Sequence, residues 1–379
     1  MKVVAHLHRS YLALSETFIY QYLKNFRTYP PVVLARRSEN LENFPINNLF
    51  VLSDQGILTQ ATGYFALRLL GRQPHFLKIL RKIQPVLLHA HFGSEGVNAI
   101  QLKRALGLPL ITTFYGKDMS ALPRQPKWQR AYNRLFKEGD AFLVEGSYMR
   151  SELAGLGCPA SKIFISHIGV DLERIQFESR TRVPDQPTRL LICGRLIEKK
   201  GIPYALHALA KVVPKYPDTL LRIVGDGPLR SEYERLILEL GLQANVRILG
   251  YLHYDDYVQE LRNAHILLVP SVRAIDGDSE GGAPTVILEA QAMGLPVLGT
   301  QHADIPEVIG IKDPGFLVPE RDSDTLADRL FMMMENPQNW PEWGRVGREH
   351  VEAHYDIRLV TANLERIYTG VLNGSKRKL

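Results

Sequence analysis

An acidic, glycine-rich loop that leads into a helix is the segment of this chain best suited to chemistry. It spans Gly277–Pro296, with the sequence GDSEGGAPTVILEAQAMGLP. Pro284 suits the first helical turn, because an N–H has no intrahelical partner there. Ala283, Thr285 and Val286 then leave unpaired N–H groups at the positive end of the helix dipole. Such a helix start predicts an anion site that would fit a phosphate.

Two carboxylates accompany that anion site, Glu280 in the loop and Glu289 in the helix. Carboxylates do not bind phosphate, but they accept hydrogen bonds from sugar hydroxyls. The segment therefore predicts a ligand in which a sugar is joined to a phosphate. The alternative is that both glutamates are solvated and that the glycines mark only the start of a helix.

Polar residues in the second half of the chain follow apolar runs that predict buried strands. The expected strands are 190–193, 220–224, 246–249, 266–269 and 296–299. Ligands of an open parallel sheet bind beyond the carboxyl ends of its strands. The residues at these ends include Gly194, Arg195, Gly225, Ser271 and Thr300. We expect them to converge on one crevice with the helix that begins at Pro284.

Arg195 and Lys200 place two cations in the turn after the first of these strands. A guanidinium fork and an ammonium can together hold a diphosphate. Taken alone, each is more often a solvated surface charge. Their position beside the expected crevice favours the diphosphate.

The elements that must position these residues form two α/β units. In the first half, the apolar runs 3–7, 32–34, 86–90, 110–114 and 141–144 predict strands buried on both faces. The amphipathic segments 15–26, 96–106, 128–137 and 148–156 predict helices between them. This alternation predicts an α/β fold with a parallel sheet covered by helices. The polar stretch 178–187 contains two prolines and predicts a linker to the second unit.

Composition and charge narrow the class of protein. The chain has 379 residues, 45% of them hydrophobic, and two cysteines, which is too few for a disulfide framework and indicates a reducing compartment. The first apolar run is too short for a signal peptide, and no 18 apolar residues follow one another. We therefore expect a cytoplasmic protein. Residues 1–170 carry 21 Lys/Arg against 10 Asp/Glu, whereas residues 171–379 carry 25 against 30, so only the first half is basic.

Taken together, these motifs resemble the retaining glycosyltransferases of family 4, whose GT-B architecture is α/β, with two Rossmann-like domains whose parallel sheets face each other across a cleft. The resemblance covers nearly the whole chain. It rests on the segments 194–201, 224–228, 269–271, 280–289 and 302–307. It implies an N-terminal acceptor domain at 1–175, a linker at 176–188 and a donor domain at 189–354. Residues 355–379 are then a helix that crosses back to the first domain, followed by a basic tail.

The resemblance also implies roles for the residues of the second domain. Arg195 and Lys200 hold the donor diphosphate, Glu289 binds the ribose, and Glu280 touches the donor sugar. One departure affects Glu280: eight residues separate the two glutamates here, where the family usually has seven. An extra glycine is expected to bulge the loop, so Glu280 is either displaced or reaches the sugar by a different route.

In the first domain, the resemblance places Tyr115 where the family has a histidine that contacts the donor sugar. Tyrosine can offer a hydroxyl to a sugar but is no proton shuttle near neutral pH. His91 could supply the missing imidazole, although a lone histidine is more often structural. Asp118 matches the family's acid and is expected to orient the acceptor. Ser15 and Glu16 occupy the place of the acceptor loop, but a plain helix N-cap at Ser15 is the stronger interpretation.

The segment Tyr64–Ile83 mixes basic residues with aromatic residues and leucines, and Pro74 is expected to divide it into two short helices. Its basic residues are Arg68, Arg72, Lys78, Arg81 and Lys82. Most amphipathic helices pack their apolar side on a sheet and leave the basic side solvated. The functional alternative is attachment to an anionic membrane surface on the cytoplasmic side. Nucleic acid is not expected, because no known binding module accompanies the charge.

We expect neither a cofactor nor a metal ion. Asp276 and Asp278 look like a metal-binding pair, but the resemblance implies that cations and a helix end neutralise the leaving diphosphate. Gly225 and Gly227 lack the third glycine and the ribose acid of a dinucleotide fingerprint, which argues against a dehydrogenase. The expected activity is transfer of a sugar from a UDP- or GDP-linked donor to a hydroxyl of a glycan or lipid-linked acceptor, with retention. Two alternatives remain: a catalytically silent nucleotide-sugar-binding protein of a polysaccharide assembly complex, and a GT-B epimerase.

Overall fold

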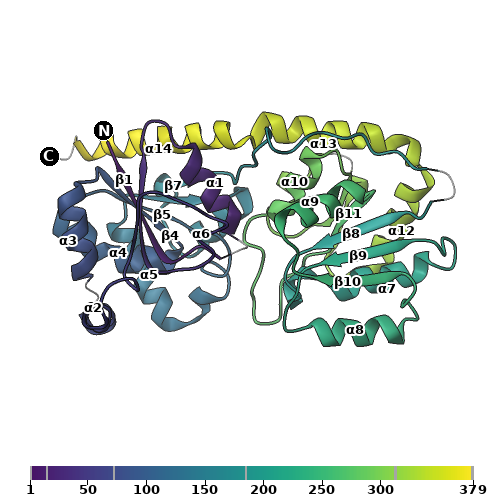
Figure 1. Ribbon diagram of the computed structural model, residues 1–379, viewed down its shortest axis with the longest axis horizontal. Helices are drawn as coiled ribbons and strands as arrows, with labels where there is room; N and C mark the ends of the chain where they lie inside the picture. The colour runs from purple at the N-terminus through teal and green to yellow at the C-terminus, as the bar shows by residue number, and fades with distance from the viewer. Residues whose placement is uncertain (1, 14–15, 71–72, 184–185, 311–313, 377–379) are drawn as a thin grey trace. The chain divides into compact units, whose positions relative to one another are not determined.

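The computed structural model describes residues 2–13, 16–70, 73–183, 186–310 and 314–376 (Figure 1). The chain divides into two compact units. The first contains residues 1–169 and 357–379, and the second contains residues 170–356. Among the described residues, no helix combines the length and the apolar character needed to cross a bilayer.

The first unit is built on a parallel sheet that, in the described part of the chain, runs in the order β3-β2-β1-β4-β5-β6-β7. The strands are β1 (Val4–Tyr11), β2 (Pro31–Ser38), β3 (Leu49–Val51), β4 (Leu87–His91), β5 (Leu110–Thr113), β6 (Ala141–Val144) and β7 (Ile163–Ile165). The strand order reverses between β1 and β4. In folds of this type, ligands bind at the carboxyl ends of the strands beside that reversal.

Helices cover both faces of this sheet, because successive side chains of each strand point to opposite sides. Ala5, Leu7, Leu88 and Ala90 face one core, with α3 (Pro74–Ile83), α4 (Gly93–Leu106), α5 (Pro126–Glu138) and α6 (Ser147–Gly155). Val4 and Leu87 face the other, under α1 (Thr17–Asn25) and α14 (Ile357–Lys376). Helix α14 is the C-terminal segment, and it contributes Val360, Leu364 and Tyr368 to this second core.

The second unit has a parallel sheet with the described order β10-β9-β8-β11-β12-β13. The strands are β8 (Arg189–Cys193), β9 (Leu220–Val224), β10 (Val246–Gly250), β11 (Ile266–Val269), β12 (Val297–Thr300) and β13 (Leu317–Val318). The helices are α7 (Ile202–Val212), α8 (Arg230–Glu239), α9 (Tyr254–Asn263), α10 (Thr285–Ala292), α11 (Ile305–Val308), α12 (Ser323–Glu335) and α13 (Trp340–His354). This is the strand order of a dinucleotide-binding Rossmann sheet, with its reversal between β8 and β11. The prediction of two parallel α/β units is confirmed.

Some boundaries differ from the expected ones. Helix α10 begins at Thr285, and Pro284 is its N-cap residue, with φ −57° and ψ 130°, rather than part of the first turn. The stretch after Ile175, expected to be a linker, packs on the second unit: the Glu178 N–H donates to the Met293 carbonyl, and Arg180 is buried. Helix α14 begins at Ile357, two residues after the expected start at 355, and Tyr355 belongs to the second unit.

Candidate active site

The turns after β8 and β9 come close enough to exclude side chains. A Cβ at Gly225, where φ is +134°, would lie 2.0 Å from the Gly194 carbonyl oxygen. A Cβ at Gly201, where φ is +60°, would lie 1.8 Å from the Pro270 carbonyl oxygen. Only glycine fits such backbone contacts. The β8 turn is therefore held against both β9 and β11, at the reversal of strand order.

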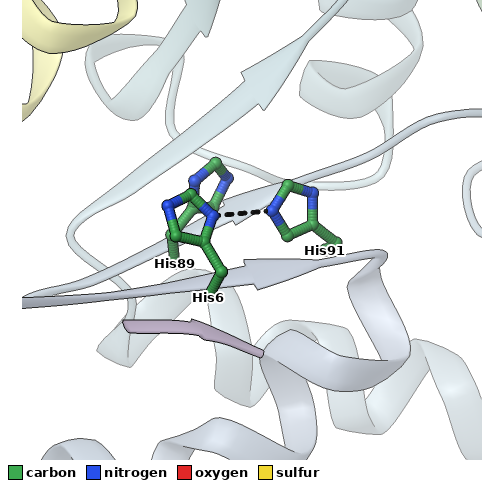
Figure 2. Close-up of side chains that lie close together, drawn as sticks. All are labelled: His6, His89 and His91. Atoms are coloured by element: carbon green, nitrogen blue, oxygen red, sulfur yellow. Dashed lines mark hydrogen bonds between the residues drawn. The ribbon is translucent and has the colours of Figure 1, made fainter. Parts of the chain in front are cut away.

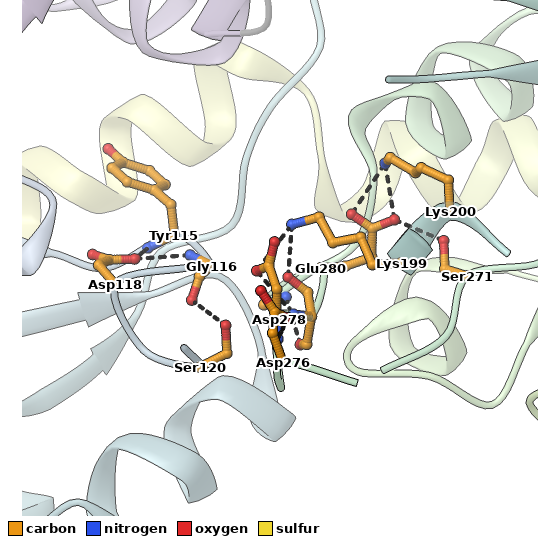
Figure 3. Close-up of polar contacts among 12 residues, drawn as sticks. Tyr115, Gly116, Asp118, Ser120, Lys199, Lys200, Ser271, Asp276, Asp278 and Glu280 are labelled. Carbon is orange, nitrogen blue, oxygen red and sulfur yellow. Dashed lines mark hydrogen bonds and ion pairs between the residues drawn. The ribbon is translucent and has the colours of Figure 1, made fainter. Parts of the chain in front are cut away.

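Lys200, Ser271 and Glu280 meet at this edge of the sheet (Figure 3). The Lys200 Nζ lies 2.8 Å from Oε1 and 3.0 Å from Oε2 of Glu280. The Ser271 hydroxyl donates to Oε1 of Glu280 at 2.7 Å. The Glu280 side chain is 7% exposed and that of Lys200 is 16% exposed, so the ion pair is shielded from water. A cation and two hydrogen-bonding groups thus converge from β8, β11 and the acidic loop.

The Glu280 carboxyl stays ionised in this setting. Burial opposes ionisation, but Lys200 and Lys199 and the hydrogen bond from Ser271 outweigh it and hold the Glu280 pKa below its usual range. The backbone of Glu280 is fixed as well, because its N–H donates to His302 Nε2 at 3.3 Å. The Nδ1 of His302 then donates to Glu320 at 2.7 Å.

The acidic loop before Glu280 is held by the neighbouring lysine. Lys199 Nζ donates to the Ser279 carbonyl at 2.8 Å and lies 3.4 Å from Asp278 Oδ1. The Asp278 N–H donates to Asp276 Oδ1 at 2.8 Å, so these carboxylates shape the loop. Figure 3 shows Lys199 and Lys200 reaching different carboxylates of the same loop.

Arg195 and the start of α10 complete the predicted donor residues. Arg195 lies directly after β8 and Gly194, and its side chain is exposed. Ala283 and Pro284 precede α10, and the N–H groups of Thr285 and Val286 lie in its first turn, where a helix leaves donors unpaired. The start of α10 is thus a preformed set of donors.

Glu289 lies in the middle of α10 and accepts a hydrogen bond from the Tyr257 hydroxyl of α9. Burial raises the pKa of Glu289 to about 7, and the hydrogen bond from Tyr257 opposes part of that rise. Cys193, at the end of β8, is close enough for Glu289 to contribute to the rise of its thiol pKa, although burial is the larger cause. Glu289 therefore lies near the end of β8, and in the part of the chain that the structure describes its side chain is hydrogen-bonded to Tyr257, whereas that of Glu280 is bound by Lys200 and Ser271.

In the first unit, Asp118 organises the turn after β5 (Figure 3). Its Oδ1 accepts from the N–H groups of Tyr115 at 3.1 Å and Gly116 at 2.9 Å, and its Oδ2 accepts from Gly93 N–H at 2.8 Å. Asp118 is 5% exposed. Both oxygens thus bind backbone, so the carboxylate ties the β5 turn to the start of α4.

His91 ends β4 and is 2% exposed, within the core under α1 and α14. Its Nδ1 lies 2.6 Å from the Tyr115 hydroxyl, and its Nε2 lies 3.0 Å from His6 Nδ1. Burial, followed by the neighbouring histidines, holds the pKa of His91 well below 6.5. The sequence placed His91 near Tyr115, and the structure brings the two into contact.

Glu16 is the N-cap residue of α1 but its side chain does not cap the helix; its Oε2 accepts from the Ala13 N–H, before the helix, at 3.2 Å. Burial raises the Glu16 pKa to about 7, while the hydrogen bond from Ala13 opposes this. Ser15 lies outside the described residues.

The basic segment of the first unit forms two helices, α2 (Ile57–Leu70) and α3, and Pro74 starts the second one as predicted. Phe76 and Leu80 of α3 are buried, whereas Lys78, Arg81 and Lys82 are exposed. On α2, Phe65 is 64% exposed. Arg72 lies outside the described residues, and so do the side chains of Tyr64 and Arg68.

Several residues of these sites were not foreseen. Tyr257 had no sequence signal, because its role depends on a contact between α9 and α10. Glu320 had a sequence signal, since it comes two residues after the short apolar run 317–318, at the carboxyl end of a strand. A sequence signal also existed for His6, His8 and His89, because each of two strands carries two histidines that are two residues apart.

Two family models match consecutive parts of the chain. Residues 21–174 match the model described as Glycosyltransferase Family 4, and residues 173–350 match the model described as Glycosyl transferases group 1.

Curated relatives are about one-third identical to this chain over the residues that align. The glycosyltransferase WcaL of Escherichia coli (strain K12), named for colanic acid biosynthesis, is 34% identical over 281 residues, which cover 73% of this chain and 68% of WcaL. The amylovoran biosynthesis glycosyltransferase AmsK of Erwinia amylovora is 30% identical over 279 residues, which cover 73% of this chain and 68% of AmsK.

Solved structures match nearly the full length. HepE of Anabaena, in complex with UDP and glucose, has a TM-score of 0.78 and 17% identity, covering 98% of this chain and 100% of that one. A sucrose-phosphate synthase from Thermosynechococcus elongatus has a TM-score of 0.79 and 18% identity, covering 99% of this chain and 100% of that one. These structures share the fold of both units.

Proposed function

Because this chain belongs to the group 1 and family 4 glycosyltransferases and has their GT-B pair of Rossmann-like domains, we propose that it moves a sugar from a nucleotide diphosphate donor to a hydroxyl of a glycan or lipid-linked acceptor. The donor is UDP- or GDP-linked, and the configuration at the sugar is retained. The second unit binds the donor and the first unit binds the acceptor.

The observation that carries the donor site is the meeting of Lys200, Ser271 and Glu280 at the reversal of strand order. An anionic diphosphate at this edge is attracted by the Lys200 ammonium and accepts hydrogen bonds from the first turn of α10. Arg195 is exposed and can turn its guanidinium fork toward the same phosphates. Glu280 lies beside the ammonium, where it accepts hydrogen bonds from hydroxyls of the donor sugar.

Glu289 supports the nucleoside part of this proposal. Its carboxylate is fixed by Tyr257 and lies on the same helix whose first turn faces the phosphates. A ribose hydroxyl donating to Glu289 would place the diphosphate at the start of α10, three to four residues earlier in the helix.

In the proposed reaction, the acceptor hydroxyl attacks on the face from which the diphosphate departs. The bond between the anomeric carbon and the diphosphate oxygen breaks as the new glycosidic bond forms. Lys200, Arg195 and the helix start stabilise the charge that develops on the leaving oxygen, which itself takes the acceptor proton. These cations do the work that a divalent metal ion does elsewhere, so the transfer is proposed to need no metal at the diphosphate.

The acceptor is proposed to be a growing bacterial polysaccharide, because the relatives WcaL and AmsK are named for the biosynthesis of colanic acid and amylovoran. Such chains are hydrophilic and large, and a lipid carrier would hold them at the membrane. The exposed cations of α3 and the exposed Phe65 of α2 suit peripheral attachment to an anionic surface on the cytoplasmic side.

A thermal-shift screen over UDP, GDP and their sugar derivatives tests the donor proposal, since a ligand that binds only the folded state raises the unfolding temperature. We expect one nucleotide class to stabilise the wild type, with a smaller shift in Lys200→Met. A Lys215→Met variant is the matched control, because Lys215 pairs with Glu335 on the surface of the same unit. If no nucleotide diphosphate shifts the wild type, or if Lys200→Met responds as the wild type does, the donor site is misplaced.

Turnover with and without acceptor tests the reaction class. Release of nucleotide diphosphate that depends on added acceptor supports transfer. Conversion of the donor sugar without acceptor indicates an epimerase, and binding without any turnover indicates a catalytically silent binding protein. Either of the last two results contradicts the proposed transfer.

A further inference from the structure

Two neighbouring strands of the first unit each carry a pair of histidines, His6 and His8 on β1, and His89 and His91 on β4. Side chains two residues apart in a strand point to the same face. The register pairs His6 with His89, so all four imidazoles stand on the face under α1 and α14. The rings stack, with centroids 4.3 Å apart for His8 and His91 and 4.4 Å apart for His89 and His91.

Three of these histidines bring nitrogen atoms together. One ring nitrogen from each of His6, His89 and His91 lies within 4.8 Å of the other two (Figure 2). The Nδ1 of His6 lies 3.0 Å from Nε2 of His91. Two imidazole nitrogens bound at about 2.0–2.1 Å in a tetrahedral zinc site lie about 3.3 Å apart. Small ring movements would therefore convert this cluster into a set of metal ligands.

The hydrogen-bond partners of the rings suit such a site. The Nδ1 of His91 lies 2.6 Å from the Tyr115 hydroxyl, which leaves its Nε2 facing His6. The Nδ1 of His89 lies 2.6 Å from the Tyr368 hydroxyl. Histidines that bind metals usually direct the other ring nitrogen to an oxygen, which orients the ring. Binding through Nε2 of His89 would replace its present contact with Thr113, which is also 2.6 Å long.

One ring nitrogen of the cluster has no partner at present. Among the described residues, His6 Nε2 is buried without a hydrogen-bond partner.

A small cavity lies beside the three rings. It is lined by His6, His89 and His91 together with Tyr22, Thr113, Tyr115 and Ser166 among other residues. It has room for about one water molecule or one small ion.

We propose that His6, His89 and His91 bind one first-row transition-metal ion, with Zn²⁺ as the best match, and that a water or hydroxide in the cavity is its fourth ligand. The ion ties β1 to β4 and stabilises the core under α1 and α14. The proposed metal ligands all belong to the first unit, whereas the donor diphosphate, at which no metal is proposed, is assigned to residues of the second unit.

The test begins with untagged protein that carries His354→Gln. His350 and His354 lie one turn apart on α13, with rings 5.0 Å apart, and would bind metal at the surface. The protein is unfolded in denaturant in the presence of a chelator, which removes any bound metal. It is then refolded with or without Co²⁺ and passed over a gel-filtration column to separate unbound ions. We expect one Co²⁺ per chain with the visible absorption of tetrahedral cobalt, which Zn²⁺ then displaces.

Single variants show whether these ligands hold the ion. His89→Gln and His91→Gln should abolish stoichiometric binding, whereas His8→Gln, in the same cluster, should retain it. Tyr115→Phe should keep the stoichiometry but weaken metal affinity by about 10–100-fold, because it removes the partner that orients His91. A purely structural tyrosine would leave metal affinity unchanged.

The wild-type chain alone can overturn the proposal, even if a histidine variant fails to fold. If the refolded wild type retains no metal and Zn²⁺ does not raise its unfolding temperature, the cavity holds water and no metal site exists. Equal retention by wild type and a folded His91→Gln would place the bound ion elsewhere, with the same conclusion. Neither result bears on the proposed sugar transfer, which is measured separately.

Discussion

The Lys200 ammonium lies within 3.0 Å of both carboxylate oxygens of Glu280, at the edge of the sheet where β8 and β11 end. A donor diphosphate that reaches the same ammonium must share it with this carboxylate. Because the Ser271 hydroxyl also donates to the carboxylate and the Glu280 N–H donates to His302, both the side chain and the backbone of Glu280 are fixed before any donor arrives. The pair therefore affects both the stability of the second unit and its affinity for nucleotides.

Lys200→Met should destabilise the protein by about 3–5 kcal/mol, because it leaves the Glu280 charge buried without its partner. The double variant Lys200→Met/Glu280→Gln should recover much of that loss. Urea unfolding measures the free energy of unfolding of the single and the double variant. Lys215→Met removes an exposed pair with Glu335 and should cost about 1 kcal/mol or less. If the double variant is as unstable as the sum of its single variants, the two side chains are not coupled.

Tyr257→Phe should change the pH dependence of nucleotide binding. Burial raises the Glu289 pKa to about 7, and the Tyr257 hydroxyl opposes part of that rise. If the ribose donates to ionised Glu289, affinity falls as the pH drops through 7, and the loss of Tyr257 moves that fall to higher pH. Calorimetric titration of nucleotide binding between pH 6 and 8.5 measures the pH at which the affinity falls.

Tyr254→Phe, on the same helix, is the matched control for this experiment and should leave the profile in place. Glu289→Gln should flatten the profile, because no titrating group then remains at that position. A profile that persists unchanged in Glu289→Gln would assign the pH dependence to another residue.

The metal-free first unit should lose stability in mild acid. The folded pKa values of His8 and His89 are about 3, below the unfolded value of 6.5, so the unfolded chain binds more protons between these limits. Stability is thus complete above about pH 6.5 and falls as the pH decreases toward 3, by up to about 1.4 kcal/mol per pH unit for each histidine.

Urea unfolding at several pH values between 7.5 and 4.5 measures this slope. His8→Gln should reduce it, because one neutral buried imidazole is lost. His354→Gln removes an exposed histidine and should leave the slope unchanged. Equal slopes in the wild type and in His8→Gln would contradict the assignment.

Asp118→Ala should destabilise the first unit by about 1–3 kcal/mol for each buried N–H that it leaves unpaired. Gly93, Tyr115 and Gly116 supply those N–H groups. Asp171→Ala, which removes an exposed bond to the Glu173 N–H, is the control and should cost little. Unfolding in urea reports the change, and a cost no larger than that of Asp171→Ala would contradict the role of Asp118 in holding the turn.

Neutralising α3 should release the protein from anionic vesicles. Lys78→Gln, Arg81→Gln and Lys82→Gln together remove three exposed charges worth about 1 kcal/mol each near lipid, so binding should weaken by about a hundredfold. The matched control neutralises Lys127, Arg130 and Arg134, which are exposed on α5 of the same unit. Co-sedimentation with vesicles rich in acidic lipid compares the two. Equal losses would indicate attraction by overall charge and would exclude α3 as the attachment surface.

The order of strands and helices was predictable because it depends on local patterns. Fully buried strands such as 220–224 and 266–269 are apolar runs between polar turns, and both were predicted at their observed positions. The short strands β3 and β7 have three residues each, which is too few for a pattern to develop.

The candidate donor site was predictable only in part. Lys200, Ser271 and Glu280 could be assigned to one crevice, since strand ends meet at one edge of a parallel sheet. That Glu280 pairs with Lys200 itself was not predictable, because the path of an irregular loop depends on contacts such as the one with His302. The sequence likewise gave no sign that Asp118 would bind backbone with both of its oxygens.

The return of α14 to the first unit has a consequence for synthesis on the ribosome. Residues 170–356 form a continuous unit that can fold as soon as it has left the exit tunnel, whereas the first unit lacks Ile357, Val360, Leu364 and Tyr368 until the segment that follows the second unit has been synthesised. During that interval the sheet face that carries the four histidines has no cover from α14. The second unit in the sequence should therefore be the first to complete its fold, and chaperones that bind nascent chains should find their target in residues 1–169.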